Sequence, residues 1–404
     1  MSALMSLLGD PQHQVPVIHI TGTNGKGTVA AMITQLLRAH GLSVGTYTSP
    51  HLEVLNERLA RDGEAISDVD LAEVLSGIAL VEPLLENRPS WFEVVTAAAF
   101  RWFAEAPVDV AVVEVGLLGR YDATNVAEAR VAVVTSIGAD HTDFAPGWEM
   151  AIASEKAGII GPDATAVIGD VSDDLLAVFA AEGPAELLRY GDGDRGDFGV
   201  LDDRIAVGGH VVTLRGPESV HQDLFLGVHG HHQVVNASIA LAAVEAFFRR
   251  PVDDEVLTEA FATLQLPGRF EVAGHEPLVV LDGAHNADAL RALARTLDEE
   301  FTPVGSRLVV AGTLQGRDVD TTVSALAALR PDLVICTTIP GDRGVEARTL
   351  AAACDAAGLP NEWAADPATA VTRALSIAQD EDMVVVTGSF RLLGPARRAL
   401  AQGH

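Results

Sequence analysis

Short apolar runs alternate with longer amphipathic stretches along most of this chain. From residue 17 onward the runs VIHIT, SVGTYT, VDVAVVEV and VAVVTSI are separated by segments that favour helices, including residues 69–86 and 91–106. Continuous β-branched runs are typical of parallel strands buried on both faces, and apolar residues at three- and four-residue spacing are typical of core-facing helices. The pattern therefore predicts consecutive βαβ units in a doubly wound α/β domain.

The pattern changes after residue 164 and again after residue 263. Residues 164–225 contain short strands separated by Gly- and Asp-rich turns, which predicts a small antiparallel annex to the first domain. Helices are expected over residues 233–248 and 253–263, and LQLPGRFE then marks a boundary before PLVVLDG, RLVVAG, DLVICT and MVVVTG restart the βα alternation. We expect two domains, residues 1–266 and a Rossmann-like α/β domain over residues 267–404, with a shared site in the cleft between them.

Composition narrows the class of protein. The 404 residues include 56 Asp and Glu against 27 Lys and Arg, a formal charge of −29 at pH 7. This excess argues against a nucleic-acid partner, because binding to a phosphate backbone needs clustered Lys and Arg. No run approaches the roughly 20 apolar residues of a membrane span, and the first residues lack the charged start and cleavage site of a secretory signal. We expect a cytoplasmic monomer with no membrane partner, in which Cys336 and Cys354 are buried or free thiols.

Lys26 and Lys156 are the only lysines, since the other 25 of the 27 basic residues are arginine. Lys26 lies in HITGTNGKGT, a strand followed by a glycine-rich turn and a helix start. The glycines let backbone N–H groups approach phosphate oxygens, Lys26 can reach the outer phosphates, and the Thr28 hydroxyl can hold Mg²⁺. The spacing differs from G-x-x-x-x-G-K-[ST], because Gly27 separates the lysine from Thr28. A tight turn explains the glycines but not Asn24, Lys26 and Thr28 together, so the motif predicts a P-loop-type ATPase domain.

The phosphate loop and a series of later segments resemble the folylpolyglutamate synthase and dihydrofolate synthase family, a branch of the Mur-type amide ligases. The segments, in order from residue 20 to residue 394, are TGTNGKGT, TSPHL, SWFEVVTAAAF, EVGLLGRYDATN, SIGADHTDF, ASEKAGII, HHQVVNASIALAA, LPGRFE, LDGAHN and TGSFRLLG. The resemblance implies a Mur-ligase-like ATP-binding domain followed by a glutamate-ligase domain.

The implied activity is ATP-dependent addition of L-glutamate to a folate through an acyl phosphate. Phosphorylation is needed because an ionised carboxylate is a poor electrophile with a poor leaving oxygen. Tetrahydrofolate is the expected acceptor, and dihydropteroate is a possible additional one. Two alternatives stay open: a Mur-type ligase for another carboxylate, and a nucleotide-binding scaffold without chemistry.

Glu114 and His141 are candidate ligands for metal ions. Glu114 ends the strand VDVAVVEV, where a doubly wound sheet faces its ligand, so its carboxylate can bind Mg²⁺ or cap the next loop. The resemblance implies two Mg²⁺ ions, with Glu114, Thr28 and Ser49 as ligands and His141 on the second ion. Read by itself, a lone histidine such as His141 is more often a structural hydrogen-bonding group, and nitrogen is an uncommon ligand for magnesium.

Lys156 lies in SEKAGII, in a helix expected to begin near residue 148. An ordinary helical lysine is a solvated charge. The resemblance instead implies that CO₂ carbamylates Lys156, which turns the cation into an anionic oxygen ligand for the second metal ion. Arginine cannot take this role. The implied catalytic set is Lys26, Glu114, His141 and Lys156.

The resemblance also assigns residues to the nucleotide, the acceptor and the incoming glutamate. Besides Lys26, Gly27 and Thr28, the implied nucleotide contacts are Thr23, Asn24, Gly25, Asn236, Arg269 and Asp282. The implied substrate contacts are Ser90, Phe92, Glu93, Tyr121, Asp122, Ala123, His285 and Ser389. Some have structural alternatives, since Phe92 fits a core position and Ser389 a helix cap. The run HGHH at residues 229–232 is expected to be a loop before a helix rather than a transition-metal site.

The chain departs from the family pattern in three places. The family's GLGGR is GLLGR here, with Leu118 in place of a glycine, and its Lys-Asp pair is Arg317 and Asp318. Only 16 residues precede the first expected strand, where family members usually carry a helix and a pterin-contacting loop. We therefore expect that N-terminal segment to be missing, through a misplaced start or because the acceptor is held differently.

Overall fold

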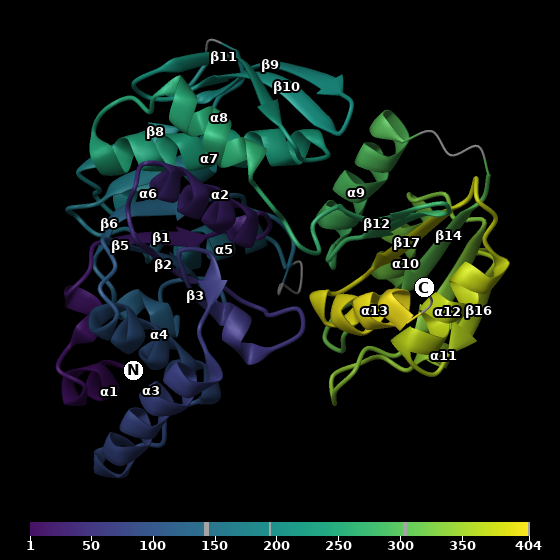
Figure 1. Cartoon of the computed structure of the whole chain (residues 1–404), viewed down its shortest axis with the longest axis horizontal. Coiled ribbons are helices and arrows are strands. Elements are labelled where there is room, and N and C mark those ends of the chain that lie inside the picture. The colour runs from purple at the N-terminus through teal and green to yellow at the C-terminus, as the bar shows by residue number, and fades with distance from the viewer. Residues whose placement is uncertain (141–144, 194, 302–304, 403–404) are drawn as a thin grey trace.

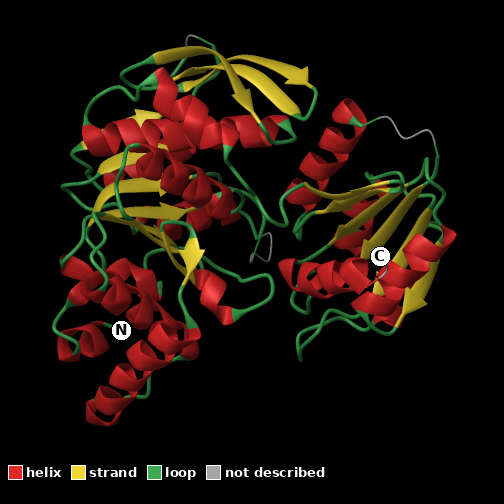
Figure 2. Cartoon of the chain, viewed as in Figure 1, coloured by secondary structure: helices red, strands yellow, loops and turns green. Residues whose placement is uncertain are grey.

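The chain folds around two large β-sheets, each flanked by helices (Figures 1 and 2). The structure, a computed structural model, describes residues 1–140, 145–193, 195–301 and 305–402. An eight-stranded sheet lies in the N-terminal part and a six-stranded sheet in the C-terminal part, and a three-stranded sheet packs over helices on one face of the first. The boundary expected at residue 266 lies between helix α8 (Asp254–Ala262) and strand β12 (Glu271–His275).

The first sheet is parallel apart from two short strands at one edge. Its order is β4-β3-β2-β5-β1-β6-β7-β8, and β3 and β4 are the antiparallel strands. The bounds are β1 (Val17–Thr21), β2 (Val44–Tyr47), β3 (Leu59–Arg61), β4 (Glu64–Ala65), β5 (Val110–Glu114), β6 (Ala129–Val134), β7 (Thr165–Ile168) and β8 (Glu186–Arg189). Every residue of β1 and β5 is buried, as their continuous apolar runs predict for central strands.

Helices cover both faces of this sheet. The helix α2 (Lys26–Ala39) packs with α7 (His231–Phe248) on one face, and α4 (Trp91–Glu105) packs on the other. The remaining helices of this part are α1 (Ser2–Leu7), α3 (Asp68–Val81), α5 (Trp148–Ala157) and α6 (Asp173–Ala181), with 3₁₀ turns at Pro11–His13, Leu55–Arg58, Glu82–Leu84 and Ala123–Val126. Almost all of α7 is buried, because it lies between the eight-stranded sheet and the three-stranded sheet.

The prediction of an antiparallel annex over residues 164–225 is wrong in its first part. Strands β7 and β8 pair in parallel and extend the main sheet, with α6 between them. Only β9 (Gly199–Ala206), β10 (Gly209–Arg215) and β11 (Val220–Leu226) form the antiparallel sheet. The four-residue strands and nine-residue helix of this βα unit are too short to show a clear period in the sequence.

A short helix precedes the first strand, so the expectation is wrong for the helix, and it stays a prediction for the pterin-contacting loop. Leu4 and Met5 of α1 are buried in the core cluster that contains α3 and α4. The amino group of Met1 donates to the carboxylate of Glu93 at the start of α4, at 2.7 Å. The six residues of α1 are too few to show a helical period, and burial in this core cluster therefore explains the helix.

The second sheet has the order β12-β13-β17-β14-β15-β16, in which only β12 is antiparallel. Its other strands are β13 (Leu278–Leu281), β14 (Arg307–Ala311), β15 (Leu333–Thr337), β16 (Asn361–Ala364) and β17 (Met383–Thr387). The helices are α9 (Ala287–Glu300), α10 (Val319–Ala327), α11 (Ala347–Ala356), α12 (Pro367–Ile377) and α13 (Phe390–Gln402). The sequence pattern missed the edge strands β12 and β16, whose exposed faces break the apolar run.

Both cysteines lie in the core of the second domain, as buried thiols 3.8 Å apart on β15 and α11. No helix among the described residues is long and apolar enough to cross a bilayer.

Glu300, at the end of α9, joins the two domains through histidines. Its carboxylate contacts the Nε2 atom of His210 on β10 at 3.0 Å and the Nδ1 atom of His229 at 2.7 Å, and it accepts from the backbone N–H of Gly230. The helix α7 begins at His231, directly after this loop. The HGHH run thus contributes to a domain contact, and the described residues contain no group of three or more His, Cys, Asp or Glu suited to a metal ion.

Candidate active site at the phosphate loop

The glycine-rich loop between β1 and α2 is tightly enclosed. Gly22 and Gly25 have positive φ angles of 151° and 84°. An added Cβ would lie 1.8 Å from the Thr135 hydroxyl at Gly22, and 2.6 Å from the side-chain oxygen of Asn236 at Gly25. These positions require glycine for both backbone conformation and space. The loop therefore lies pressed between the end of β6 and helix α7.

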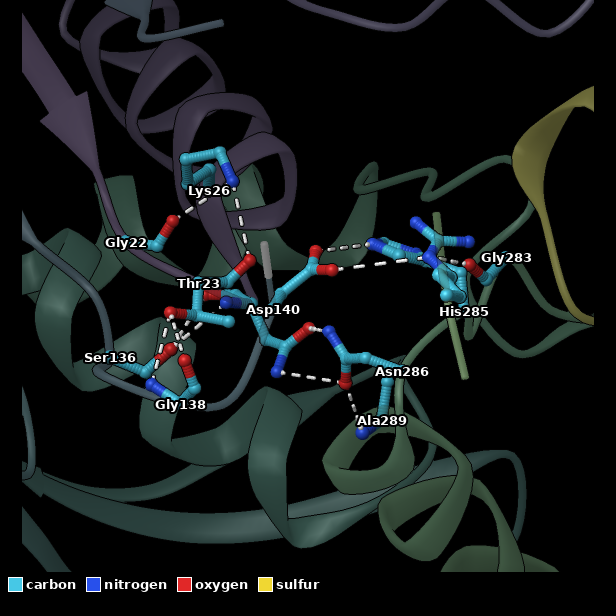
Figure 3. A network of polar contacts seen from close by, with 12 residues as sticks. Gly22, Thr23, Lys26, Ser136, Gly138, Asp140, Gly283, His285, Asn286 and Ala289 are labelled. Atoms are coloured by element: carbon cyan, nitrogen blue, oxygen red, sulfur yellow. Dashed lines mark hydrogen bonds and ion pairs between the residues drawn. The ribbon is translucent and has the colours of Figure 1, made fainter. Parts of the chain in front are cut away.

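Lys26 begins α2 and folds back over the loop (Figure 3). Its ammonium group donates to the carbonyl oxygens of Gly22 at 3.0 Å and Thr23 at 3.3 Å. The Lys26 ammonium group thus lies beside the backbone of the glycine-rich loop, at the N-terminus of α2, where a phosphate group can bind. Thr28, in the first turn of α2, is 1% exposed.

Glu114 supplies a buried carboxylate beside the loop. It is 3% exposed and accepts the backbone N–H of Ser49 at 2.9 Å. Burial raises the pKa of Glu114, and the opposing charges of Lys26, Arg269 and Arg58 offset part of that rise. A carboxylate oxygen is a ligand that Mg²⁺ prefers, whereas the positive charges of Lys26 and Arg269 call for phosphate oxygens to balance them when the ion binds. The Glu114 carboxylate therefore fits magnesium, and Thr28 and Ser49 stay predicted companion ligands.

Lys156 differs from an ordinary helical lysine. It is 4% exposed on α5, and its Nζ atom donates to the carbonyl oxygen of Gly22 at 2.8 Å. Burial and the nearby charge of Lys26 lower the pKa of Lys156 to about 7, against the opposing charge of Asp140. The structure therefore brings both lysines to the same carbonyl of the loop. His141, predicted as the companion of Lys156, lies outside the described residues.

Arg269 and Asp282 bring the second domain to the loop. An added Cβ at Gly27 would lie 2.1 Å from Nη2 of Arg269 and 3.4 Å from a carboxylate oxygen of Glu114. The guanidinium lies 4.9 Å from the centre of the Phe390 ring, which orients it across the domain junction. The Asp282 carboxylate accepts the backbone N–H groups of Phe270 and Ala284, each at 2.7 Å. Asp282 thus holds the turn that carries Arg269, and its contact with ribose stays a prediction.

The turn before α9 contacts two loops of the first domain (Figure 3). The side chains of Asn286 and Asn24 exchange hydrogen bonds of 2.9 and 3.4 Å. His285 Nε2 lies 3.4 Å from the Asp140 carboxylate, and Arg317 Nε lies 3.9 Å from it. We did not predict Asp140 or Arg317 as site residues, although Asp140 adjoins His141 in the SIGADH segment.

Most predicted acceptor contacts have structural roles. Ser90 and Glu93 form the capping box of α4, and the amino terminus lowers the pKa of Glu93 to about 2 through its hydrogen bond. The half-buried Phe92 ring packs against the core cluster, 6.2 Å from the Tyr47 ring, and would overlap a Cβ added at Gly116.

The remaining predicted substrate contacts differ in exposure. Asp122 accepts the backbone N–H groups of Thr124 and Leu117, and Ala123 is buried. Tyr121 is 86% exposed. Ser389 is buried and accepts the N–H of Arg391 at 3.3 Å at the start of α13. Of these residues, Tyr121 alone is largely open to solvent.

Leu118, where the family pattern has glycine, adopts a left-handed backbone with a φ angle of 59°. Its carbonyl oxygen accepts the hydroxyl of Thr21 in β1, which fixes this turn beside the loop. Leu118 thus has a left-handed backbone conformation that glycine adopts readily and that residues with a side chain rarely adopt.

Leu118→Gly should be more stable than Leu118→Ala by about 1 kcal/mol, since both remove the same packing and only alanine keeps the strained φ. Urea unfolding of both variants measures the difference. The neighbouring pair Leu117→Gly and Leu117→Ala is the control, because Leu117 is not among the residues with positive φ and alanine should be the more stable there. The same order at both positions would contradict strain at Leu118.

Comparison with known proteins places the chain in a family. A Mur ligase middle-domain model matches residues 20–244, and a Mur ligase glutamate-ligase-domain model matches residues 268–390. A dihydrofolate synthase/folylpolyglutamate synthase of Mycobacterium tuberculosis is 39% identical over 98% of this chain and 88% of its own length. The chain belongs to the folylpolyglutamate synthase/dihydrofolate synthase family of Mur ligases.

Solved structures of this family share the fold. A folylpolyglutamate synthase of Mycobacterium tuberculosis complexed with ADP superimposes with a TM-score of 0.94 at 40% identity, over 99% of this chain and 93% of that one. A bifunctional folylpolyglutamate synthase/dihydrofolate synthase with Mn, AMPPNP and L-glutamate bound gives a TM-score of 0.86 at 31% identity, over 99% and 93% of the two chains. The family's two-domain α/β architecture is therefore that of this chain.

Proposed function

We propose that this protein is an ATP-dependent ligase that adds L-glutamate to a folate through an acyl phosphate. The observation that carries the proposal is the convergence of Lys26, Lys156 and Glu114 on one phosphate loop, with Arg269 reaching it from the second domain. Family membership and relatives that bind ADP, or Mn, AMPPNP and L-glutamate, support it. Tetrahydrofolate is the proposed main acceptor and dihydropteroate an additional one.

The loop and its cations would bind ATP and position its outer phosphate. Lys26 would exchange its contacts with Gly22 and Thr23 for the γ-phosphate, while Arg269 would approach from the second domain. The acceptor carboxylate attacks the γ-phosphorus, and ADP leaves. The amino group of L-glutamate then attacks the acyl carbon, phosphate leaves, and the ammonium loses its proton. Asn236 and Asp282 would hold the base and the ribose.

Magnesium held by Glu114, Thr28 and Ser49 would supply positive charge that offsets the charge on the phosphates. A second ion at His141 and Lys156 completes the proposed set. His285 and Ser389 would contact L-glutamate. The site for the folate acceptor would be formed by Ser90, Phe92, Glu93, Tyr121, Asp122 and Ala123.

Lys156 is proposed to act as a carbamate. Its neutral amine attacks the carbon of CO₂, a C–N bond forms, one C=O electron pair moves to oxygen, and the amine proton goes to solvent. The buried position beside Gly22 supports this reaction, because it disfavours the ammonium form that cannot react. We also propose that the enzyme acts as a cytoplasmic monomer.

Phosphate release tests the ligase activity. Purified enzyme is supplied with ATP, Mg²⁺ and L-glutamate. Phosphate release is then compared between reactions that contain tetrahydrofolate, dihydropteroate, a peptidoglycan precursor or no acceptor. Release that needs both a folate acceptor and glutamate is expected. Release only with the peptidoglycan precursor would overturn the folate assignment, and ATP binding without release under any condition would favour the scaffold.

A further inference from the structure

The side chain of Asn24 faces the second domain. Its backbone is tied to the end of β6, since the Asn24 N–H donates to the Ser136 hydroxyl at 3.0 Å and its carbonyl accepts from Thr135 and Ser136 at 2.6 and 3.1 Å. Its side-chain amide bonds to Asn286, which is 262 residues away in the chain. The residue therefore belongs to the first domain by its backbone and contacts the second by its side chain.

The orientation of the two amides follows from a helix cap. The side-chain oxygen of Asn286 accepts the backbone N–H of Ala289 at 2.9 Å and so caps α9 (Figure 3). Because that oxygen faces the helix, the amide nitrogen of Asn286 is directed at the Asn24 oxygen, at 2.9 Å. Asn286 is only 8% exposed, so few water molecules can replace this contact. The geometry of α9 thus decides where the Asn24 amide is held.

The contact lies where movement of the second domain would reach the phosphate loop directly. Asn24 is followed by Gly25, which touches Asn236, and then by Lys26. The neighbouring residue His285 contacts Asp140 of the first domain, so the same turn also binds the loop after β6. Separation of the domains would break the hydrogen bonds between Asn24 and Asn286, and the phosphate loop would lose this contact with the second domain.

We propose that the Asn24–Asn286 amide pair is a closure latch that positions the phosphate loop for phosphoryl transfer when the second domain is docked. Both are positioning residues, and the Asn24 side chain acts through Asn286 rather than by binding phosphate. This inference rests on the proposed ligase function and deepens it. It replaces the implied role of the Asn24 side chain as a direct nucleotide contact.

A double-mutant cycle tests the latch with Asn24→Ala and Asn286→Ser. Serine can still cap α9 but is too short to reach Asn24, so the folded state should persist, which thermal unfolding checks. Each single variant should lower kcat about tenfold, and the double variant no further, because either change removes the same contact. ADP affinity should change less than about threefold, since the backbone of the loop is intact.

Glu300→Gln is the matched control. It weakens a domain contact made by the same helix α9 at its other end, away from the loop. If the amide pair merely holds the domains together, Glu300→Gln should lower kcat as much as Asn286→Ser does and should show the same coupling to Asn24→Ala. The latch predicts independent effects for Glu300→Gln and Asn24→Ala.

Multiplicative effects on kcat in the Asn24 and Asn286 double variant would overturn the latch, and so would ADP affinity that is lost in Asn24→Ala but kept in Asn286→Ser. Small-angle scattering with a non-hydrolysable ATP analogue separates this inference from the proposed function. Even if the wild type released no phosphate, the analogue should reduce the radius of gyration of the wild type more than that of either single variant. Equal compaction of all three proteins would contradict the latch.

Discussion

Lys156→Arg is expected to lower kcat by about a thousandfold, the order of magnitude for removing a group that stabilises transition-state charge. Arginine keeps a positive charge and cannot form the carbamate. It also places a larger, permanently charged group at a 4% exposed position where the lysine amine has a pKa of about 7. Steady-state phosphate release with a folate acceptor measures the loss.

The pH and CO₂ dependence of activity tests the chemistry of Lys156. Below about pH 7 the amine is protonated and cannot attack CO₂, and above it the neutral form predominates. Enzyme depleted of CO₂ should therefore regain activity faster at pH 8 than at pH 6 when equal dissolved CO₂ is restored. ¹³C-labelled CO₂ should give a carbamate signal that Lys156→Arg lacks.

Two variants complete this test. Lys156→Ala should recover part of its activity with added formate or acetate, whose carboxylate can occupy the site of the missing carbamate. The exposed Arg61→Lys is the control for exchange of the two basic residues and should be fully active. Full activity of Lys156→Arg would exclude the carbamate.

Lys26→Arg is expected to lower kcat/KM by about a hundredfold or more, since the phosphate loop encloses a compact ammonium group. In the structure Nζ of Lys26 reaches two loop carbonyls, and Arg269 already occupies the space beside Gly27. A planar guanidinium would have to displace one of these groups. Initial rates at varied ATP, with saturating acceptor and glutamate, measure the change.

Nucleotide affinity distinguishes the role of Lys26 from general damage to the loop. If Lys26 contacts the outer phosphate, Lys26→Arg and Lys26→Met should weaken a non-hydrolysable ATP analogue by about tenfold or more while ADP affinity falls much less. Equal loss for both nucleotides would contradict an outer-phosphate contact. Wild-type binding with Lys26→Met would exclude the role altogether.

The long apolar runs predicted the central strands correctly, but short elements escaped prediction. Every residue of β1, β5, β14 and β17 is buried, as is most of β6 and β15, and their β-branched apolar runs indicate this burial. The parallel strands β7 and β8 were mistaken for part of the annex, because four residues between turns carry no clear period. The helix α1 was not expected because it is stabilised by burial of Leu4 and Met5 in the core cluster shared with α3 and α4.

The sequence also predicted part of the candidate site, as it predicted the longer strands. Glycines at positions with positive φ, followed by a lysine and a threonine at a helix start, indicate a phosphate loop through local chemistry alone. The roles of Ser90 and Glu93 were harder to predict, because a capping box and a ligand contact use the same residue types.

Local sequence thus determines the strands, the glycine turn and the helix start that make the phosphate loop, because these depend on backbone freedom and short-range hydrogen bonds. The state of Lys156 depends on tertiary structure, since only burial beside Lys26 moves its pKa to about 7. The partner of Asn24 does too, because Asn286 reaches it only when the two domains meet. Desolvation and contacts between distant residues exist only after packing, and they decide how the local motif can work.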